Sequence, residues 1–131
     1  MKKKESMSYN KELAINILKQ IEKAILLIQN RTLEIHSASD FLSSPSNVEK
    51  LDAACMQFIA IGESLKGLDK VTNKELLRTD SNIPWSRIMG LRDIIAHHYF
   101  DIDAEEIWWI IENELEPLLK AVQAFIHKLS L

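Results

Sequence analysis

The densest group of chemically capable side chains lies between residues 92 and 103. It contains Arg92, Asp93, His97, His98 and Tyr99, followed by two further aspartates. An arginine can hold a phosphate through paired hydrogen bonds, an imidazole titrates near neutral pH, and a tyrosine adds a hydroxyl donor. These are the side chains that a site cleaving a phosphodiester bond requires.

Helical spacing limits how these side chains can cooperate. Arg92 and Tyr99 are seven residues apart and share one stripe, whereas His97 lies about 140° from Arg92 on a helix. One straight helix therefore cannot bring all three together. Either the helix ends near His97, or two copies of the segment face each other across a twofold axis. Asp93 precedes His97 by one turn and could orient the imidazole and raise its basicity.

Two other interpretations of the segment stay open. An Arg, an Asp and a His on one exposed helix face commonly form a solvated patch of ion pairs with no chemistry. Alternatively, His97, His98, Asp101 and Asp103 could offer nitrogen and oxygen ligands to a metal ion, although no two of them repeat a recognised metal spacing. Two interpretations also stay open for Trp108 and Trp109. They could stack bases, or at least one of them could belong to the core or to an interface.

The composition favours a helical chain that folds without disulfide bonds. It has 131 residues with only three Gly and three Pro, too few turn residues for a many-stranded barrel or sandwich. The single cysteine, Cys55, excludes an internal disulfide and fits a reducing compartment. It lies on an apolar helical stripe, so we interpret it as a core side chain. No apolar stretch approaches the ~20 residues that span a bilayer, so we expect a cytoplasmic protein with no membrane partner.

The charge argues against a protein that coats nucleic acid. The net charge is −3, whereas sequence-independent binding of phosphates needs a surplus of Lys and Arg. The acidic surplus is local, because seven acids and no bases lie between Asp101 and Glu116. The sequence is therefore still compatible with a small basic site elsewhere.

Apolar residues recur at helical spacing along the chain, which predicts an all-α fold. We expect one domain over residues 1–131, an antiparallel four-helix bundle with one or two short extra helices, in which residues 1–8 form a flexible tail. Gly62 lies inside the second helix, where glycine costs about 1 kcal/mol relative to alanine, so we expect another backbone to pass close to it.

Capping residues and prolines set the expected helix bounds. The first helix should cover about residues 9–35, and capping boxes at Ser46/Glu49 and Thr72/Glu75 should start the second helix and a short one ending near Arg78. Pro84 should open a helix that runs to about Tyr99, and Asp103 should cap a last helix that Pro117 kinks.

Arg92, His97 and Tyr99 reproduce the Arg-x4-His-x-Tyr motif of the HEPN superfamily. The wider context resembles the HepT-like toxins of HEPN/MNT toxin–antitoxin pairs, over about residues 10–125. The supporting matches are Phe41-Leu42, Ile61-Gly62-Glu63, Ile83-Pro84-Trp85, Gly90-Leu91-Arg92 and His97-His98-Tyr99-Phe100.

The resemblance implies a HEPN-like homodimer whose paired motifs line a cleft and cut RNA without a metal or a cofactor. By position, Arg92 would bind the scissile phosphate and His97 would act as general acid or base, supported by Asp93 and His98. Tyr99 would receive AMP from a partner MNT-type nucleotidyltransferase antitoxin. His98 stands where the family often has Asp, and Asp93 stands where Asn is frequent.

The sequence therefore predicts a metal-independent endoribonuclease toxin of a type II toxin–antitoxin system, acting on RNA rather than DNA. The alternative is a non-catalytic helical module that docks a partner nucleotidyltransferase. Both hypotheses need the same helices, so only cleavage of RNA by the purified protein separates them.

Overall fold

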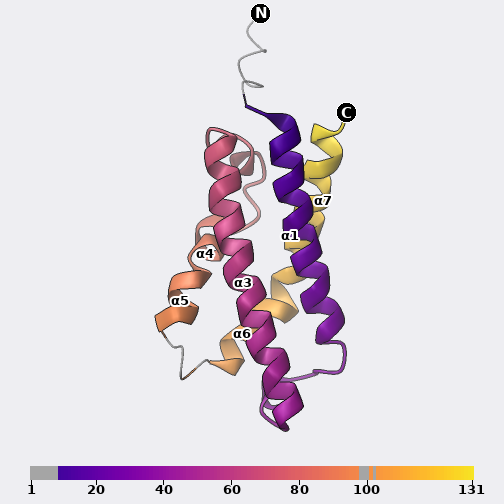
Figure 1. Cartoon of the computed structure of the whole chain (residues 1–131), viewed down its shortest axis with the longest axis vertical. Coiled ribbons are helices and arrows are strands. Elements are labelled where there is room, and N and C mark those ends of the chain that lie inside the picture. The colour runs from indigo at the N-terminus through magenta and orange to yellow at the C-terminus, as the bar shows by residue number, and fades with distance from the viewer. Residues whose placement is uncertain (1–8, 98–100, 102) are drawn as a thin grey trace, which may run out of the picture.

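The computed structural model describes residues 9–97, 101 and 103–131, and these form a bundle of helices (Figure 1). Helix α1 (Lys11–Arg31) leads through the short α2 (Ala38–Phe41) to the long α3 (Pro45–Val71). A 3-10 turn, η2 (Leu77–Thr79), precedes α4 (Trp85–Met89) and α5 (Leu91–His97), and the chain returns through α6 (Ala104–Asn113) and α7 (Leu115–Leu129). The described residues contain no strand, so the predicted all-α class is confirmed. The expected tail, residues 1–8, lies outside the described range.

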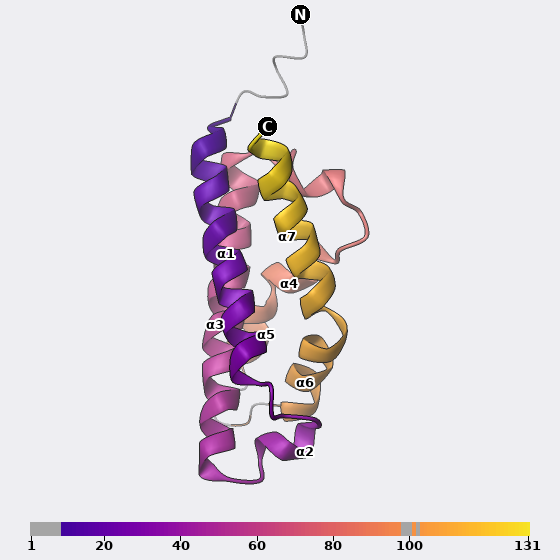
Figure 2. The ribbon, with the colours of Figure 1, turned by 90° about the vertical axis from the view of Figure 1, so that its right-hand side faces the viewer.

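The helices run antiparallel in four passes, two of which are broken. α1 packs against α3 and α7, α4 and α5 cover another side of α3, and α2 lies against α6 at one end of the bundle (Figures 1 and 2). The core is apolar, with fully buried side chains such as Leu18, Ile25, Phe58 and Leu65. None of the helices in the described ranges combines the length and the apolar character that crossing a bilayer requires.

Two of the predicted capping boxes are wrong. α3 begins before Ser46, because Ser44 accepts a hydrogen bond from the Asn47 N–H at 3.1 Å and Pro45 occupies the first helical position, where its missing N–H costs nothing. Thr72 ends α3 instead of starting a new helix. Its buried hydroxyl donates to the Leu68 carbonyl at 2.9 Å, and only the 3-10 turn follows.

The last two predicted helices are each broken once. Gly90 caps α4, and its N–H is shared between the Ser86 and Arg87 carbonyls at 3.1 Å, so α5 starts as a separate short helix. The last helix stops at Asn113 and resumes at Leu115. Pro117 lacks the N–H that would bond the Asn113 carbonyl, so the break expected from this proline falls one turn before it. Asp103 caps α6 as predicted, accepting from the N–H groups of Glu105 and Glu106.

Gly62 allows α4 to approach α3 closely, as the sequence predicted. A methyl group built on Gly62 would stand 3.0 Å from the Ile88 carbonyl oxygen and 3.3 Å from that of Met89. The C-terminal end of α4 therefore rests on the α3 backbone itself. This contact fixes where α5 begins relative to α3.

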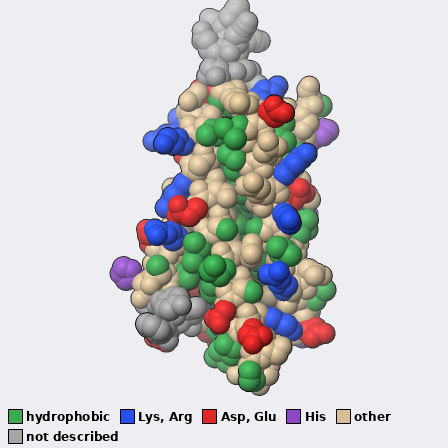
Figure 3. Space-filling view, in the orientation of Figure 1, with side chains coloured by type: hydrophobic (Ala, Val, Ile, Leu, Met, Phe, Trp, Pro, Cys, Tyr) green, Lys and Arg blue, Asp and Glu red, His purple; other side chains and the backbone are tan. Residues whose placement is uncertain are grey.

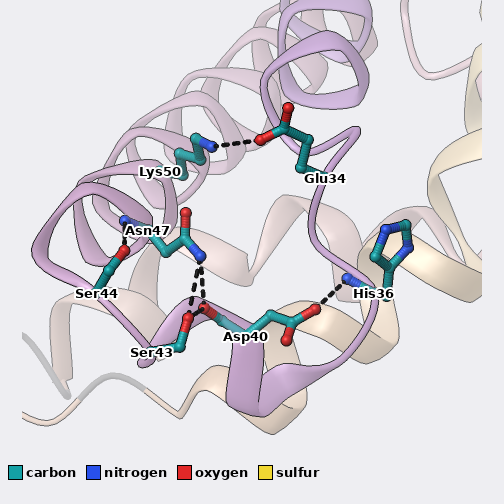
Figure 4. Close-up of polar contacts among 7 residues, drawn as sticks. All are labelled: Glu34, His36, Asp40, Ser43, Ser44, Asn47 and Lys50. Carbon is teal, nitrogen blue, oxygen red and sulfur yellow. Dashed lines mark hydrogen bonds and ion pairs between the residues drawn. The ribbon is translucent and has the colours of Figure 1, made fainter.

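A polar corner holds α2 at the end of the long helices. Asp40 accepts from the His36 N–H at 2.7 Å, and Asn47 donates to the Asp40 carbonyl at 2.9 Å (Figure 4). Lys50 of α3 lies 3.8 Å from Glu34, just after α1. These contacts fix the turn between α1 and α3 and so place α2 against the start of α6.

Candidate nuclease site on α5

The short helix α5 carries the predicted site residues that the structure describes. Leu91 and Ile95 are buried and anchor α5 on α3, while Arg92, Asp93 and His97 are exposed. His98 and Tyr99, and with them Phe100 and Ile102, lie outside the described residues. α5 thus presents the cation and one imidazole of the predicted motif to the surface.

Arg92 lies against a carboxylate of α3. Its Nε is 3.8 Å from Oε2 of Glu63, and its Nη1 is 3.9 Å from Oδ1 of Asp93. Both pairs are long and solvent-exposed, a class worth about 0–1 kcal/mol each. Glu63 therefore favours one orientation of the guanidinium without holding it tightly, and these weak contacts can be exchanged for a phosphate.

Asp93 contacts Arg92, and it also lies one helical turn before His97. α5 spans both Asp93 and His97, so the expected i, i+4 arrangement is present. Around the same helix, Arg92 and His97 project about 140° apart. α5 ends at His97, which is the first of the two arrangements expected from the sequence, and a second copy of α5 is the other way to bring the two side chains together.

Acidic side chains gather at the start of α6. A hollow of about 470 Å³ lies between α2 and this region, and its lining includes Asp101, Asp103, Glu105 and Glu106. Among the residues that the structure describes, no three His, Cys, Asp or Glu side chains are arranged to hold a metal ion. His98, one of the ligands considered for a metal, lies outside that part of the chain.

The two adjacent tryptophans have different surroundings. Trp108 is partly buried and makes an edge-on contact with Phe41, with ring centroids 6.2 Å apart. Trp109 is exposed, and the Arg87 guanidinium lies 5.1 Å from its ring centroid. Arg87 also forms an ion pair with Glu114, so this arginine ties α4 to the junction of α6 and α7.

Cys55 is a core side chain, as interpreted from its stripe. It is buried on α3, and this burial, with a smaller contribution from Asp52, raises the pKa of its thiol to about 12. A thiol with so high a pKa is not an effective nucleophile near neutral pH.

Sequence reasoning did not assign a role to Glu63 or Lys66. The Lys66 Nζ lies 3.3 Å from the same Glu63 oxygen that faces Arg92, so one carboxylate joins two cations from different helices. The available signal was the spacing of Glu63 and Lys66 on one helical face. Their closeness to Arg92 depends on the packing of α4 and α5 on α3, which the sequence did not specify.

The chain is similar to proteins described as ribonucleases. The family described as "Ribonuclease HepT-like" matches residues 6–125. A "Probable ribonuclease HepT" of Thermococcus cleftensis is 29% identical over 102 residues, 77% of this chain and 84% of that protein. A "Putative RNase" of Caldanaerobacter subterraneus subsp. tengcongensis is 37% identical over 68 residues, 52% of this chain and 57% of that protein.

A "Putative RNase" of Methanocaldococcus jannaschii is 33% identical over 66 residues, or 50% of this chain. The matched segments span 57% and 51% of the Caldanaerobacter and Methanocaldococcus proteins, about half of their length. No solved structure shows a significant match. Because the family model covers nearly the whole chain, this protein belongs to the ribonuclease HepT-like family.

Proposed function

We propose that the chain is the endoribonuclease toxin of a type II toxin–antitoxin system and that Arg92 and His97 carry its chemistry. The observation that supports this most is the exposure of both side chains on α5 in a chain of the ribonuclease HepT-like family. Glu63 adds support, because it orients the guanidinium without neutralising it in a buried pair.

The proposed reaction is attack by a ribose 2′-hydroxyl on the adjacent phosphorus. His97 takes the hydroxyl proton while the new O2′–P bond forms, and Arg92 holds the negative charge that develops on the phosphate oxygens. The P–O5′ bond then breaks, and the departing O5′ takes a proton from a general acid. The products are a 2′,3′-cyclic phosphate and a 5′-hydroxyl, so atoms and protons balance.

The divergence of Arg92 and His97 on α5 supports a homodimer. A second copy placed across a twofold axis would bring its own α5 to the first, so that an imidazole from one copy and a guanidinium from the other share one cleft. Within such a cleft, the His97 that took the 2′-hydroxyl proton can return it to O5′ as the P–O5′ bond breaks. On one helix the spacing directs the two side chains apart, and the second copy is the proposed source of the missing partner.

Tyr99 is the proposed site of control by a partner nucleotidyltransferase antitoxin. It is seven residues after Arg92 in sequence, and AMP on its hydroxyl would bring a phosphodiester anion that Arg92 could bind in place of RNA. Mass spectrometry of the chain co-expressed with such an enzyme should find AMP on the Tyr99 peptide and none in Tyr99→Phe. An adduct on Tyr9 instead would contradict this proposal.

The deciding experiment is an RNA cleavage assay on protein purified away from any antitoxin. Arg92→Ala and His97→Ala should each lower the rate by at least ~100-fold, the contribution of a positioned acid or base, without changing the melting temperature. His36→Ala and His127→Ala replace exposed histidines elsewhere and should leave the rate nearly unchanged.

Two outcomes would contradict the proposal. If wild-type protein fails to cut RNA, the chain is better described as the non-catalytic module that docks a nucleotidyltransferase. If EDTA abolishes cleavage and Mg²⁺ or Mn²⁺ restores it, the metal interpretation of His97, His98, Asp101 and Asp103 replaces acid–base chemistry. Activity that survives the chelator is the expected result.

A further inference from the structure

The two sides of α5 differ in charge, since one is acidic and the other carries basic side chains interspersed with acidic ones. Toward α2, four carboxylates line the hollow at the start of α6: Asp101, Asp103, Glu105 and Glu106. Toward the C-terminal half of α3, Arg92, Lys66 and Lys70 are exposed. Figure 3 shows Lys and Arg side chains, with Asp and Glu side chains among them, down the left-hand edge of the molecule, where that part of α3 lies beside α4 and α5. A polyanionic strand is repelled by the first side, whereas the second offers it exposed cations that individual phosphates can contact.

The basic side is continuous with Arg92. Lys66 and Arg92 approach the same oxygen of Glu63, at 3.3 and 3.8 Å, so the two cations lie within about 7 Å of each other. Lys70 follows Lys66 by one turn, about 6 Å further along the helix axis. It is exposed, and no ion pair among the described residues involves it. The spacings of three and four put Glu63, Lys66 and Lys70 on one stripe of α3.

We infer that Lys66 and Lys70 form a phosphate-binding strip for single-stranded RNA, which continues from the phosphate held by Arg92. This inference rests on the proposed ribonuclease function and adds the path of the substrate outside the cleavage motif. Successive phosphates pass from Arg92 to Lys66 and Lys70, along α3 and away from the acidic hollow. The lysines contact phosphates alone, so the strip binds without regard to base sequence.

The strip is tested by binding measurements that need no cleavage. The probe is a fluorescent 20-nucleotide 2′-O-methyl RNA, which lacks the nucleophilic hydroxyl at every position. Its affinity for the full chain is measured by anisotropy at several salt concentrations. The test variant is Lys66→Gln/Lys70→Gln, and the matched control is Lys19→Gln/Lys23→Gln, which removes two exposed lysines with the same spacing from α1.

The test variant should bind about 10-fold more weakly near 0.1 M salt. Its slope of log affinity against log salt should fall by about 1.4, or roughly 0.7 for each phosphate that a lysine no longer neutralises. The control should match wild type in both quantities. Cleavage of RNA by the control variant Lys19→Gln/Lys23→Gln should be unchanged, because neither lysine lies in the proposed strip or beside Arg92.

Each contrary result has a distinct meaning. If both double variants show the same reduction in slope, binding is a general effect of net charge and the strip is wrong. If the test variant keeps the wild-type slope while wild type still cuts RNA, the strip is wrong and the ribonuclease proposal stands. If wild type binds the probe with the predicted slope but cuts no RNA, the strip is kept and the catalytic proposal fails.

Discussion

At Arg92, Glu63 has two opposing effects on an RNA-cleaving site. Its carboxylate orients the guanidinium, and it also competes with RNA phosphates for Arg92 and Lys66. Glu63→Gln should therefore lower kcat by about 10-fold through poorer positioning. It should also lower KM, because two cations are released for phosphate binding.

Steady-state kinetics on a defined oligonucleotide separate these two effects. Glu49→Gln, which removes an exposed carboxylate from the same helix far from Arg92, is the matched control and should change neither constant. A uniform loss of kcat/KM with unchanged KM, accompanied by a lower melting temperature, would show that Glu63 is merely structural.

Cys55 makes a separate prediction about alkaline pH. Burial raises the pKa of its thiol to about 12, so the folded chain keeps this proton at pH values where the unfolded chain loses it. The unfolded state therefore binds fewer protons above about pH 9, and the free energy of unfolding should fall as pH rises from there toward 12. Cys55→Ala lacks this contribution, so the stability gap between wild type and variant should narrow between pH 8 and pH 10.5.

The same residue offers a direct chemical check. At pH 9, iodoacetamide should label Cys55 readily in urea and hardly at all in the native protein, since thiolate is the reactive form. Rapid labelling of the native chain at a rate independent of urea would contradict the buried position of this thiol.

At the scale of elements, the contact of α4 with α3 at Gly62 decides where α5 lies. Gly62→Ala puts a methyl group 3.0 Å from the backbone oxygen of Ile88, so α4 must move away from α3. We expect a loss of about 1–3 kcal/mol in the free energy of unfolding, as for overpacked cores. Because Arg92 follows α4 directly, cleavage should fall as well.

Gly67 provides the control on the same helix. A methyl group there meets nothing within 4 Å, so Gly67→Ala should stabilise the chain by about 0.5–1 kcal/mol through helix propensity alone. Urea unfolding of both variants measures the difference. If the two substitutions shift the urea midpoint of unfolding in the same direction, the close approach of α4 to Gly62 does not limit the stability of the chain.

At the scale of the whole molecule, the proposed site draws on two copies of the chain. Exposed apolar side chains also remain on the bundle, among them Ile94 on α5 and Trp109 on α6. We expect a dimer at micromolar concentration, because a twofold contact would both cover such residues and complete the cleft. Light scattering checks this directly.

Mixed dimers give the sharper test of a shared site. Combining Arg92→Ala and His97→Ala chains should restore part of the activity, because one of the two clefts in a mixed dimer can keep an intact arginine and histidine. A monomer in light scattering, or mixed dimers as inactive as either parent, would contradict the composite site.

The sequence by itself determined the helical class, the cap at Asp103, the core position of Cys55 and the need for space at Gly62. These follow from local rules, since periodicity, capping and the absence of a side chain act within a turn or two of one helix. It misplaced the start of α3 and the role of Thr72, because several polar residues near each helix end could cap and only one set of contacts satisfies the backbone.

Only the tertiary structure decided which charged groups meet. Glu63 and Arg92 are 29 positions apart in the sequence, and their contact exists because α4 rests on Gly62 and Gly90 separates α4 from α5. No local pattern encodes that approach, since it depends on the volumes of side chains packed between three helices. The motif therefore predicted a role for Arg92, whereas the packing of α5 on α3 placed Glu63 and Lys66 beside it.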